Sequence, residues 1–497
     1  MDAARAYPVR VVPYAFARAH GVLLLDASDT QASVCLREGA GPHALAELTR
    51  VLGVRVKVMS FEPPEVFERR LAEAYSKANQ SAARVAGDLE QDMDLSRLVQ
   101  EMPKIEDLLD TENDAPIIRM INVLLTQALR QGASDIHIEP YETRSVVRFR
   151  IDGTLQNVVE PHRALHAAMV SRIKIMANLD IAEKRLPQDG RISLRLAGRQ
   201  VDVRVATLPT GFGERAVLRL LDKEGGRLEL AGLGMNESTL VNVDKLIHQP
   251  HGIVLVTGPT GSGKTTTLYA ALSRLDSLVL NIMTVEDPIE YELDGVSQTQ
   301  VNAKIDMTFA RALRSILRHD PDVIMVGEIR DLETAQIAVQ ASLTGHLVLA
   351  TLHTNDAASA TTRLVDMGVE PYLLSSSLLG VLAQRLVRKL CTSCRSPYAP
   401  SASDLSEVGI DRVGLELYGP VGCAECSGTG YSGRTGIYEL LAVDREARRL
   451  IHQASSEHML REHALRVGMC MLRQDGLRWL LAGVTSLEEI IRVTRES

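Results

Sequence analysis

The segment GPTGSGKT, residues 258–265, has the residue types and spacing that hold a nucleotide phosphate. It follows the apolar run GIVLVT and precedes a stretch of helical character, which is the strand–loop–helix setting of a P-loop. Glycines there let backbone N–H groups face phosphate oxygens, while Lys264 neutralises the β and γ phosphates and the Thr265 hydroxyl binds Mg²⁺. A glycine-rich turn without a ligand is the alternative, which both flanking elements disfavour. The residues predicted to contact the nucleotide are Gly258, Pro259, Thr260, Gly261, Ser262, Gly263, Lys264, Thr265 and Thr266.

A second segment with chemical potential is PDVIMVGEIRDLETA, residues 321–335, in which an apolar run leads into Gly327 and Glu328. Many P-loop hydrolases carry an aspartate at the position of Gly327 to help hold Mg²⁺, and glycine cannot ligate a metal. Glu328 still projects from the end of the predicted strand, where a carboxylate can act as general base or orient the attacking water. An apolar strand that ends in glutamate is a common pattern by itself. Together with the P-loop, however, it predicts hydrolysis with Glu328 as the catalytic carboxylate.

The segment TVEDPIEY, residues 284–291, places Glu286, Asp287 and Glu290 just past another predicted strand. Acidic groups at that edge can hold metal-bound waters or orient the attacking water. We predict that Glu286 or Asp287 supplies the acidic help that Gly327 cannot. A solvated acidic turn is the alternative.

Two histidines, His346 and His353, lie at either end of the apolar run in TGHLVLATLHTNDA, residues 344–357. Either ring could sense the γ phosphate or bridge to a neighbouring element, although an isolated histidine is more often structural. Neither has cysteine, histidine or carboxylate partners at metal-ligand spacing, so a metal role is not predicted for them.

Four cysteines form two CxxC pairs, Cys391 with Cys394 and Cys423 with Cys426. Paired thiolates on two tight turns give a tetrahedral four-sulfur set, which suits a structural Zn²⁺. The intervening loop is longer than the commonest spacing of ~15–20 residues, and a redox or iron–sulfur role is the alternative. The remaining cysteines, Cys35 and Cys470, are predicted to be small buried residues.

Arginines recur where hydrolysis could use them, because an arginine delivered by another domain or subunit can stabilise charge on the γ phosphate. Most surface arginines have no such role. The candidates are Arg204 and Arg219 on strands that precede the P-loop, and Arg311, Arg314, Arg318 and Arg330 around the strand of Glu328.

These residues require strands and helices that bring them together, and the chain divides accordingly. Residues 1–80 mix short apolar runs with helical patterns and are predicted to form a small α/β module. Residues 81–114 are polar and acidic, as in a linker. Residues 115–235 are predicted to begin with a helix, N-capped by Asp114, and to continue as a mostly antiparallel sheet with Asp-Gly and Ala-Gly turns.

Residues 236–497 change to apolar strands that alternate with helical segments. The predicted strands lie in GIVLVTG, LNIMTVED, DVIMVGEI and HLVLATLH. Strict alternation predicts parallel βαβ units with ligands at the carboxyl ends of the strands, which is where the candidate residues occur.

Composition narrows the class of protein. The 497 residues exceed what one hydrophobic core supports, and the fractions of 45% hydrophobic and 24% charged residues are ordinary for globular proteins. A net charge of −8 argues against a protein that coats nucleic acid. Since we find no signal peptide and no run of the ~20 apolar residues that span a bilayer, a cytoplasmic protein is predicted.

In their order along the chain, these motifs resemble the secretion ATPases of the type II secretion and type IV pilus superfamily. The resemblance is carried by SDIHIEP, RFRIDG, RLPQDGRI, GPTGSGKTTTLY, NIMTVEDPIEY, ILRHDPDVIMVGEIRDLETA, TGHLVLATLHTNDA, the CxxC pairs and GYSGRTGIYELL. The opening VRVVPYAFARAHGVLLL is more like the type II secretion subgroup, the general secretion pathway E proteins. The resemblance implies a RecA-like P-loop ATPase domain with a parallel sheet, preceded by a PAS-like α/β domain and a small N-terminal α/β module. It also implies a zinc-binding insertion at residues 388–430.

In that family the Walker B strand lacks its aspartate and keeps its glutamate, which assigns catalysis to Glu328. Residues 284–291 and 344–357 match the family's Asp box and His box. The implied ligands are ATP, Mg²⁺ on Thr265 and Zn²⁺ on the four paired cysteines. The arginines that match those at the family's nucleotide and domain interfaces are Arg204, Arg219, Arg314, Arg318, Arg330 and Arg434.

The resemblance further implies a homo-hexamer, peripherally bound to the inner membrane, that drives pseudopilus assembly and protein export across the outer membrane. Its implied partners are the cytoplasmic domain of general secretion pathway protein L (GspL), bound through residues 1–100, the platform protein GspF and acidic phospholipid. A type IV pilus assembly ATPase is the nearest alternative. A nucleic-acid motor and a non-catalytic scaffold are further alternatives, disfavoured by the acidic balance and by the presence of Lys264, Thr265 and Glu328 respectively.

Overall fold

The structure of the chain is a computed structural model. The structure describes residues 115–495 apart from 197–198, 223–228 and 411–413, and in the first hundred residues chiefly 20–27, 31–40 and 55–64. The predicted linker at 81–114, with the N-cap at Asp114, lies outside the described residues. The chain forms two compact units, residues 1–103 and 104–497.

The first unit contains a three-stranded sheet in the order β1-β2-β3. Strand β2 pairs antiparallel with β1 and parallel with β3. Val22, Val34 and Phe67 are fully buried on it, so the apolar runs in this part of the sequence form a core. The strand bounds are β1 Val22–Ala27, β2 Gln31–Arg37 and β3 Arg55–Glu62.

The second unit begins with a six-stranded antiparallel sheet in the order β6-β5-β4-β9-β8-β7, as the alternating pattern predicted. In the central strand β4, Ile136 and Ile138 alternate with Asp135, His137 and Glu139, so apolar and ionisable side chains leave opposite faces. Helices α6 and α7 pack on this sheet. The bounds are α6 Ala115–Arg130, β4 Ala133–Pro140, β5 Ser145–Ile151, β6 Thr154–Val159, α7 Leu165–Met176, β7 Gln188–Leu196, β8 Arg199–Thr210 and β9 Gly213–Asp222.

A seven-stranded sheet, in the order β12-β11-β13-β14-β10-β15-β18, organises the rest of the second unit. All its neighbouring strands pair in parallel except β15 and β18. The four strands predicted from the sequence are β10, β11, β13 and β14, and their parallel pairing is confirmed. The bounds are β10 Gly252–Thr257, β11 Ile282–Glu286, β12 Val296–Gln300, β13 Val323–Val326, β14 Leu347–Leu352, β15 Leu378–Leu390 and β18 Tyr431–Ala442.

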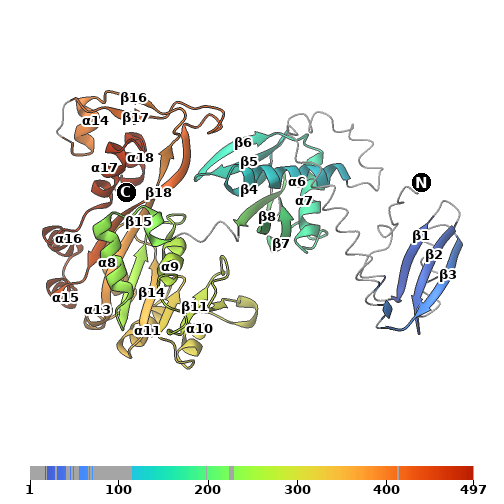
Figure 1. The fold of residues 1–497 in the computed structure, drawn as a ribbon, viewed down its shortest axis with the longest axis horizontal. Coiled ribbons are helices and arrows are strands. Elements are labelled where there is room, and N and C mark those ends of the chain that lie inside the picture. The colour runs from blue at the N-terminus through green and yellow to red at the C-terminus, as the bar shows by residue number, and fades with distance from the viewer. Residues whose placement is uncertain are drawn as a thin grey trace. The chain divides into compact units, whose positions relative to one another are not determined.

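Helices cover both faces of this sheet (Figure 1). In β10, Ile253 and Leu255 pack with helices α10–α13, whereas Val254 and Val256 pack with α8 and α9. Burial on both faces explains why these strands are apolar throughout instead of alternating. The bounds are η2 Leu230–Leu233, α8 Glu237–Ile247, α9 Lys264–Leu272, η3 Ala303–Ile305, α10 Phe309–Ile316, α11 Leu332–Leu343, α12 Ala357–Asp366 and α13 Pro371–Ser377.

The last part of the chain adds a cysteine-bearing segment that contains α14, followed by helices α15 to α18, and Figure 1 draws this part in orange and red. Helices α15 to α18 share one hydrophobic core with the parallel strands. Among the residues that the structure describes, every helix is too short or too polar to cross a bilayer. The bounds are β16 Ser396–Tyr398, α14 Ala402–Glu407, β17 Leu417–Gly419, α15 Arg445–His452, α16 Glu457–Arg466, α17 Leu472–Leu481 and α18 Leu487–Thr494.

Candidate active site

The carboxyl ends of three adjacent parallel strands bring the P-loop, Glu328 and His353 to one edge of the sheet. Strands β10 and β14 end level, with Thr257 opposite Leu352, and Val326 of β13 pairs with Ala350 of β14. The P-loop follows β10, Glu328 follows β13 and His353 follows β14. Segments far apart in sequence therefore meet where ligands bind in open α/β sheets.

The P-loop turns directly into α9, which begins at Lys264. Gly263 has a φ of 87°, a left-handed conformation that glycine adopts without strain. Lys264 is 8% exposed, and its ammonium donates to the carbonyl oxygens of Gly258 at 2.8 Å and Pro259 at 3.2 Å. Burial lowers the pKa of Lys264 to about 8, while Glu328 acts in the opposite direction. An anionic phosphate at this place would favour the charged ammonium.

A buried hydroxyl of the P-loop also suits a phosphate. Ser262 is 3% exposed, and its Oγ makes no hydrogen bond to any part of the chain that the structure describes. Buried polar atoms are almost always satisfied, so an orphan hydroxyl in this loop fits a ligand that accepts its proton.

Glu328 lies between a cation and a histidine. One carboxylate oxygen pairs with the Arg330 guanidinium, and the other lies 3.5 Å from Nε2 of His353. Arg330 also contacts Asp287, at 3.4 Å. Burial and the nearby Lys264 ammonium lower the pKa of His353, so its ring is neutral at pH 7. The Glu328 side chain stays 17% exposed, which leaves it accessible to a water molecule.

Glu286 lies in a different environment. It is 2% exposed and accepts hydrogen bonds from the Tyr269 hydroxyl, from Thr284 Oγ1 at 2.6 Å and from Gln298 Nε2 at 3.0 Å. Its carboxylate therefore joins β11, α9 and β12. A catalytic role for Glu286 stays a prediction, which this burial does not favour. Asp287 is the acid of this segment that approaches Glu328, through Arg330.

The two histidines of the His box lie at opposite ends of β14. His353 is at the P-loop edge, as described. His346 precedes the strand, and its backbone carbonyl accepts from Gly252 at the start of β10. The His346 ring bonds Ala341 O at 2.8 Å, so it closes a helix-to-strand turn. Of the two predicted alternatives for His346, the structural one fits this geometry.

The candidate arginines differ in their contacts: Arg204 and Arg219 form a pair, Arg330 contacts Glu328, and the others have partners elsewhere. Arg204 and Arg219 are cross-strand neighbours on β8 and β9. Arg204 donates to Ile289 O at 3.0 Å and pairs with Glu290 at 3.4 Å, whereas Arg219 pairs with Asp135 at 2.8 Å.

Arg330 alone of the candidates contacts Glu328 among the described residues. The others have partners elsewhere: Arg311 pairs with Asp306, Arg314 with Glu333 and Arg434 with Asp152, while Arg318 donates to Arg314 O.

Gln384 and Arg385 contact the site but were not among the residues predicted from the sequence. Gln384 is 2% exposed on β15, and its Oε1 accepts from Thr267 Oγ1 of α9 at 2.7 Å. A Cβ added at Gly263 would lie 2.9 Å from Gln384 Nε2, so this amide packs directly against the P-loop. Arg385 donates to Asn355 Oδ1 at 3.0 Å. The sequence did contain an indication of their role, because two adjacent polar residues interrupt the largely apolar run LLGVLAQRLVRKL.

The four paired cysteines meet in space. Their sulfur atoms all lie within 4.8 Å of one another. Three of the sulfur pairs are 3.8 Å apart, which is far longer than the ~2.05 Å of a disulfide. Backbone N–H groups of Gly422 and Gly430 donate to the sulfurs of Cys394 and Cys426. Thiolates are the sulfur state that such donors stabilise.

Comparisons with known proteins show that the chain is similar to type II/IV secretion system proteins. The sequence profile of the family described as "Type II/IV secretion system protein" matches residues 110–492, and the profile of an N-terminal domain of "GSPII protein E" matches residues 11–75. The type II secretion system protein HxcR of Pseudomonas aeruginosa is 60% identical over 98% of this chain and 100% of its own length. The type II secretion system ATPase E of Vibrio cholerae is 53% identical over 98% of this chain and 97% of its own.

Two solved structures are similar as well. The pilus retraction motor PilT, crystallised with bound ADP, has a TM-score of 0.52 and 28% identity, covering 76% of this chain and 97% of its own. The ATPase DotB of Legionella pneumophila has a TM-score of 0.56 at 20% identity, covering 76% of this chain and 95% of its own. The second likeness concerns the fold alone.

Proposed function

Because the chain belongs to the type II/IV secretion system protein family, as an ATP-hydrolysing member of its type II secretion subgroup, we propose that Lys264, Thr265 and Glu328 form its ATPase centre. Lys264 neutralises phosphate charge as the ligand displaces the carbonyls of Gly258 and Pro259. The Thr265 hydroxyl would hold the Mg²⁺ that accompanies ATP, and this ion would supply further charge neutralisation.

Glu328 activates the attacking water in this proposal. The observation that carries it is the placement of Glu328 and His353 at the same strand edge as Lys264, with the Glu328 carboxylate partly open to solvent. A neutral His353 can share a hydrogen bond with Glu328 without neutralising it, which keeps the carboxylate basic. Arg330 orients the second oxygen of Glu328 and links it to Asp287.

Steady-state ATP turnover tests this assignment. We expect Glu328→Gln to lower kcat by at least 100-fold while nucleotide affinity is kept, and Lys264→Ala to lower nucleotide affinity. Glu446→Gln, a change in the exposed pair of Glu446 with Arg449, is the matched control and should leave both parameters as they are. Full activity of Glu328→Gln would refute the catalytic role of Glu328.

We propose that Arg204 and Arg219 close over the γ phosphate during turnover. Arg204 supports this proposal best, since its guanidinium already contacts the 284–291 segment through Ile289 and Glu290. In this proposal a rotation of the 115–235 domain exchanges these contacts for phosphate contacts and couples hydrolysis to movement. Arg204→Lys should lower kcat, because a lysine cannot form the bidentate phosphate contact of a guanidinium.

We further propose that Cys391, Cys394, Cys423 and Cys426 hold a structural Zn²⁺. With Zn–S bonds of ~2.3 Å, the sulfurs of a tetrahedral site lie about 3.8 Å apart, which fits the three sulfur pairs at 3.8 Å. Zinc bound by four thiolates has no open position, so it would order residues 388–430 without taking part in hydrolysis.

The place of the protein in the cell is also a proposal. We propose a homo-hexamer on the cytoplasmic side of the inner membrane, which binds the GspL cytoplasmic domain through residues 1–100, contacts GspF and drives pseudopilus assembly. The match of residues 11–75 to a domain of "GSPII protein E" supports the type II pathway. ATP turnover should rise with the GspL domain and acidic phospholipid, and this rise should disappear when residues 1–100 are deleted. Stimulation by DNA alone would place the same chemistry in a different machine.

A further inference from the structure

We propose that Arg461 and Glu439 are positioning residues for ATP hydrolysis, which hold the segment 353–356 so that His353 meets Glu328. The inference rests on the proposed catalytic role of Glu328 and extends it to the C-terminal helices. Arg461 lies outside the motifs that carry the family resemblance, whereas Glu439 lies within one of them, GYSGRTGIYELL.

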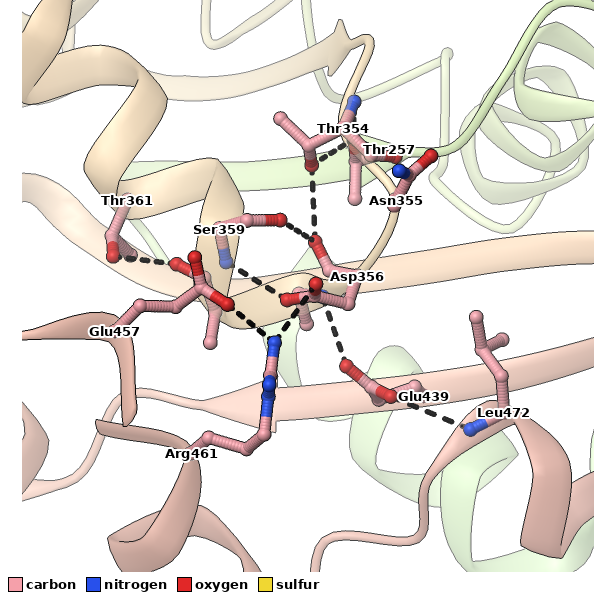
Figure 2. A network of polar contacts seen from close by, with 12 residues as sticks. Thr257, Thr354, Asn355, Asp356, Ser359, Thr361, Glu439, Glu457, Arg461 and Leu472 are labelled. Carbon is pink, nitrogen blue, oxygen red and sulfur yellow. Dashed lines mark hydrogen bonds and ion pairs between the residues drawn. The ribbon is translucent and has the colours of Figure 1, made fainter. Parts of the chain in front are cut away.

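Successive residues of the segment 353–356 contact different elements, and Figure 2 shows three of them, Thr354, Asn355 and Asp356. The Thr354 hydroxyl lies 2.8 Å from Oγ1 of Thr257, the last residue of β10 before the P-loop, and the Thr354 N–H donates to the same oxygen at 2.9 Å. Asn355 accepts from Arg385 of β15. The segment thus runs from the catalytic edge at His353 along the base of the P-loop.

Asp356 connects the far end of the segment to α16. Its Oδ1 accepts from the Ser359 N–H and caps α12, while its Oδ2 pairs with Arg461 at 3.0 Å. Arg461 also pairs with Glu457 one turn earlier on α16. Arg461 is 28% exposed and Asp356 is 23% exposed, so water only partly screens this pair.

Glu439 of β18 contacts the same part of the chain, the start of α12 that Asp356 caps. It is 3% exposed, and its two oxygens accept from the backbone N–H groups of Ala357 at 2.9 Å and Leu472 at 3.4 Å. These are the first residues of α12 and α17, so one buried carboxylate joins two helix N-termini. Figure 2 shows the Glu439 side chain near that of Asp356.

The charges explain why Arg461 matters. Asp356, Glu439 and Glu457 are three carboxylates around one guanidinium, and the negative charges of Asp356 and Glu439 repel one another. Without Arg461, Asp356 keeps its capping hydrogen bond but loses its cationic partner, so Asp356 and the start of α12 can shift. His353 is only three residues from Asp356, so a shift there reaches the 3.5 Å contact with Glu328. Misplacement by ~1 Å can cost about 100-fold in rate.

Turnover kinetics of the full-length chain test this inference with Arg461→Ala, Arg461→Lys and Glu439→Gln. We expect Arg461→Ala to lower kcat about tenfold, with the KM for ATP and the Kd for ADP changed by less than about twofold. Arg461→Lys should recover part of the loss because it keeps the charge. Arg449→Ala, which breaks an exposed pair on the preceding helix, is the matched control and should keep wild-type turnover.

Wild-type kcat in Arg461→Ala would overturn the inference, as would a loss of kcat and ADP affinity in parallel. If Arg461→Ala does not fold, Arg461→Lys and Glu439→Gln test the inference instead, through the same three quantities: kcat, the KM for ATP and the Kd for ADP. Glu328→Gln, measured alongside, separates the catalytic role of Glu328 from the positioning role of Arg461. Full activity of Glu328→Gln refutes the proposed function. An inactive Glu328→Gln with wild-type kcat in Arg461→Ala refutes the positioning role alone.

Discussion

Gly327 packs directly against Val285 of the neighbouring strand. The Gly327 N–H donates to Val285 O at 2.8 Å, and a Cβ added at Gly327 would lie 3.2 Å from that oxygen and 3.3 Å from the Cα of Glu286. An aspartate side chain at this position would therefore meet the backbone of β11. Close strand packing gives a physical reason for the glycine, and it leaves Glu328, one residue later, as the acid that reaches the edge.

Substitution of Gly327 should cost stability before it affects chemistry. We expect Gly327→Ala to lower the free energy of unfolding by about 1 kcal/mol, and Gly327→Asp by more than about 2 kcal/mol because it also crowds a charge against a carbonyl oxygen. Thermal unfolding measures both. Gly232→Ala is the control, since a Cβ there meets no atom of the described residues within 4 Å. Equal melting temperatures for Gly327→Asp and wild type would contradict the packing argument.

Nucleotide affinity should fall as pH rises above about 8. The pKa of Lys264 is lowered to about 8 by burial, so the ammonium deprotonates above that pH in the free protein. Phosphate binds the charged form, and binding above pH 8 must therefore take up a proton. We expect the Kd for ADP to be constant between pH 6.5 and 7.5 with respect to this group, and to rise up to about tenfold per pH unit above 8.

Isothermal titration in buffers of different ionisation enthalpy measures both the Kd and the proton uptake. Circular dichroism over the same pH range controls for unfolding. A constant Kd up to pH 9.5 would show that Lys264 stays charged without its ligand.

Metal removal should loosen the cysteine-bearing segment and leave the ATPase centre in place. Purified protein is expected to contain one zinc per chain by elemental analysis, and Cys423→Ser to lose it. Loss of the ion should lower the melting temperature and expose residues 388–430 to protease, because metal binding is coupled to local folding. Cys470→Ala, at a cysteine outside the cluster, should keep the zinc. Iron in place of zinc would favour the iron–sulfur alternative.

The sequence was most informative where one physical rule applied. The apolar runs before Gly258, Glu328 and His353 predicted parallel strands, and the rule that ligands bind at their carboxyl ends predicted that these residues meet. The spacing of the paired cysteines likewise predicted their cluster, since two tight turns bring four sulfurs together. These predictions needed no knowledge of the rest of the fold.

Long-range partners could not be predicted in this way. Glu286 and Glu328 both follow an apolar strand, yet only the fold shows that Tyr269, Thr284 and Gln298 surround Glu286. The pairing of Arg461 with Asp356 depends on how α16 packs beside α12, which no local pattern indicates. Gln384 was a local signal, a polar residue within an apolar strand, whose meaning depends on its contact with Thr267.

The last prediction concerns Glu489, which anchors α18 to β15. Glu489 is fully buried and accepts hydrogen bonds from the Arg388 N–H at 3.0 Å, from the Arg388 guanidinium at 2.8 Å and from Arg492 at 2.6 Å. These donors outweigh burial and lower the pKa of Glu489 to about 2. Arg388 lies three residues before Cys391, so this anchor also fixes the strand that enters the cysteine cluster.

Removing the charge of Glu489 should destabilise the protein at neutral pH and matter less in acid. Glu489→Gln leaves two guanidinium groups without their carboxylate, which should cost about 3 kcal/mol. A lowered carboxyl pKa contributes stability above the unfolded value of ~4.3, and this contribution is lost as pH falls toward 2. The difference in melting temperature between wild type and Glu489→Gln should therefore be largest at pH 6–7 and narrow below pH 4. Glu488→Gln, at the exposed neighbouring acid, is the control, and a difference independent of pH would mean that Glu489 acts through packing instead of charge.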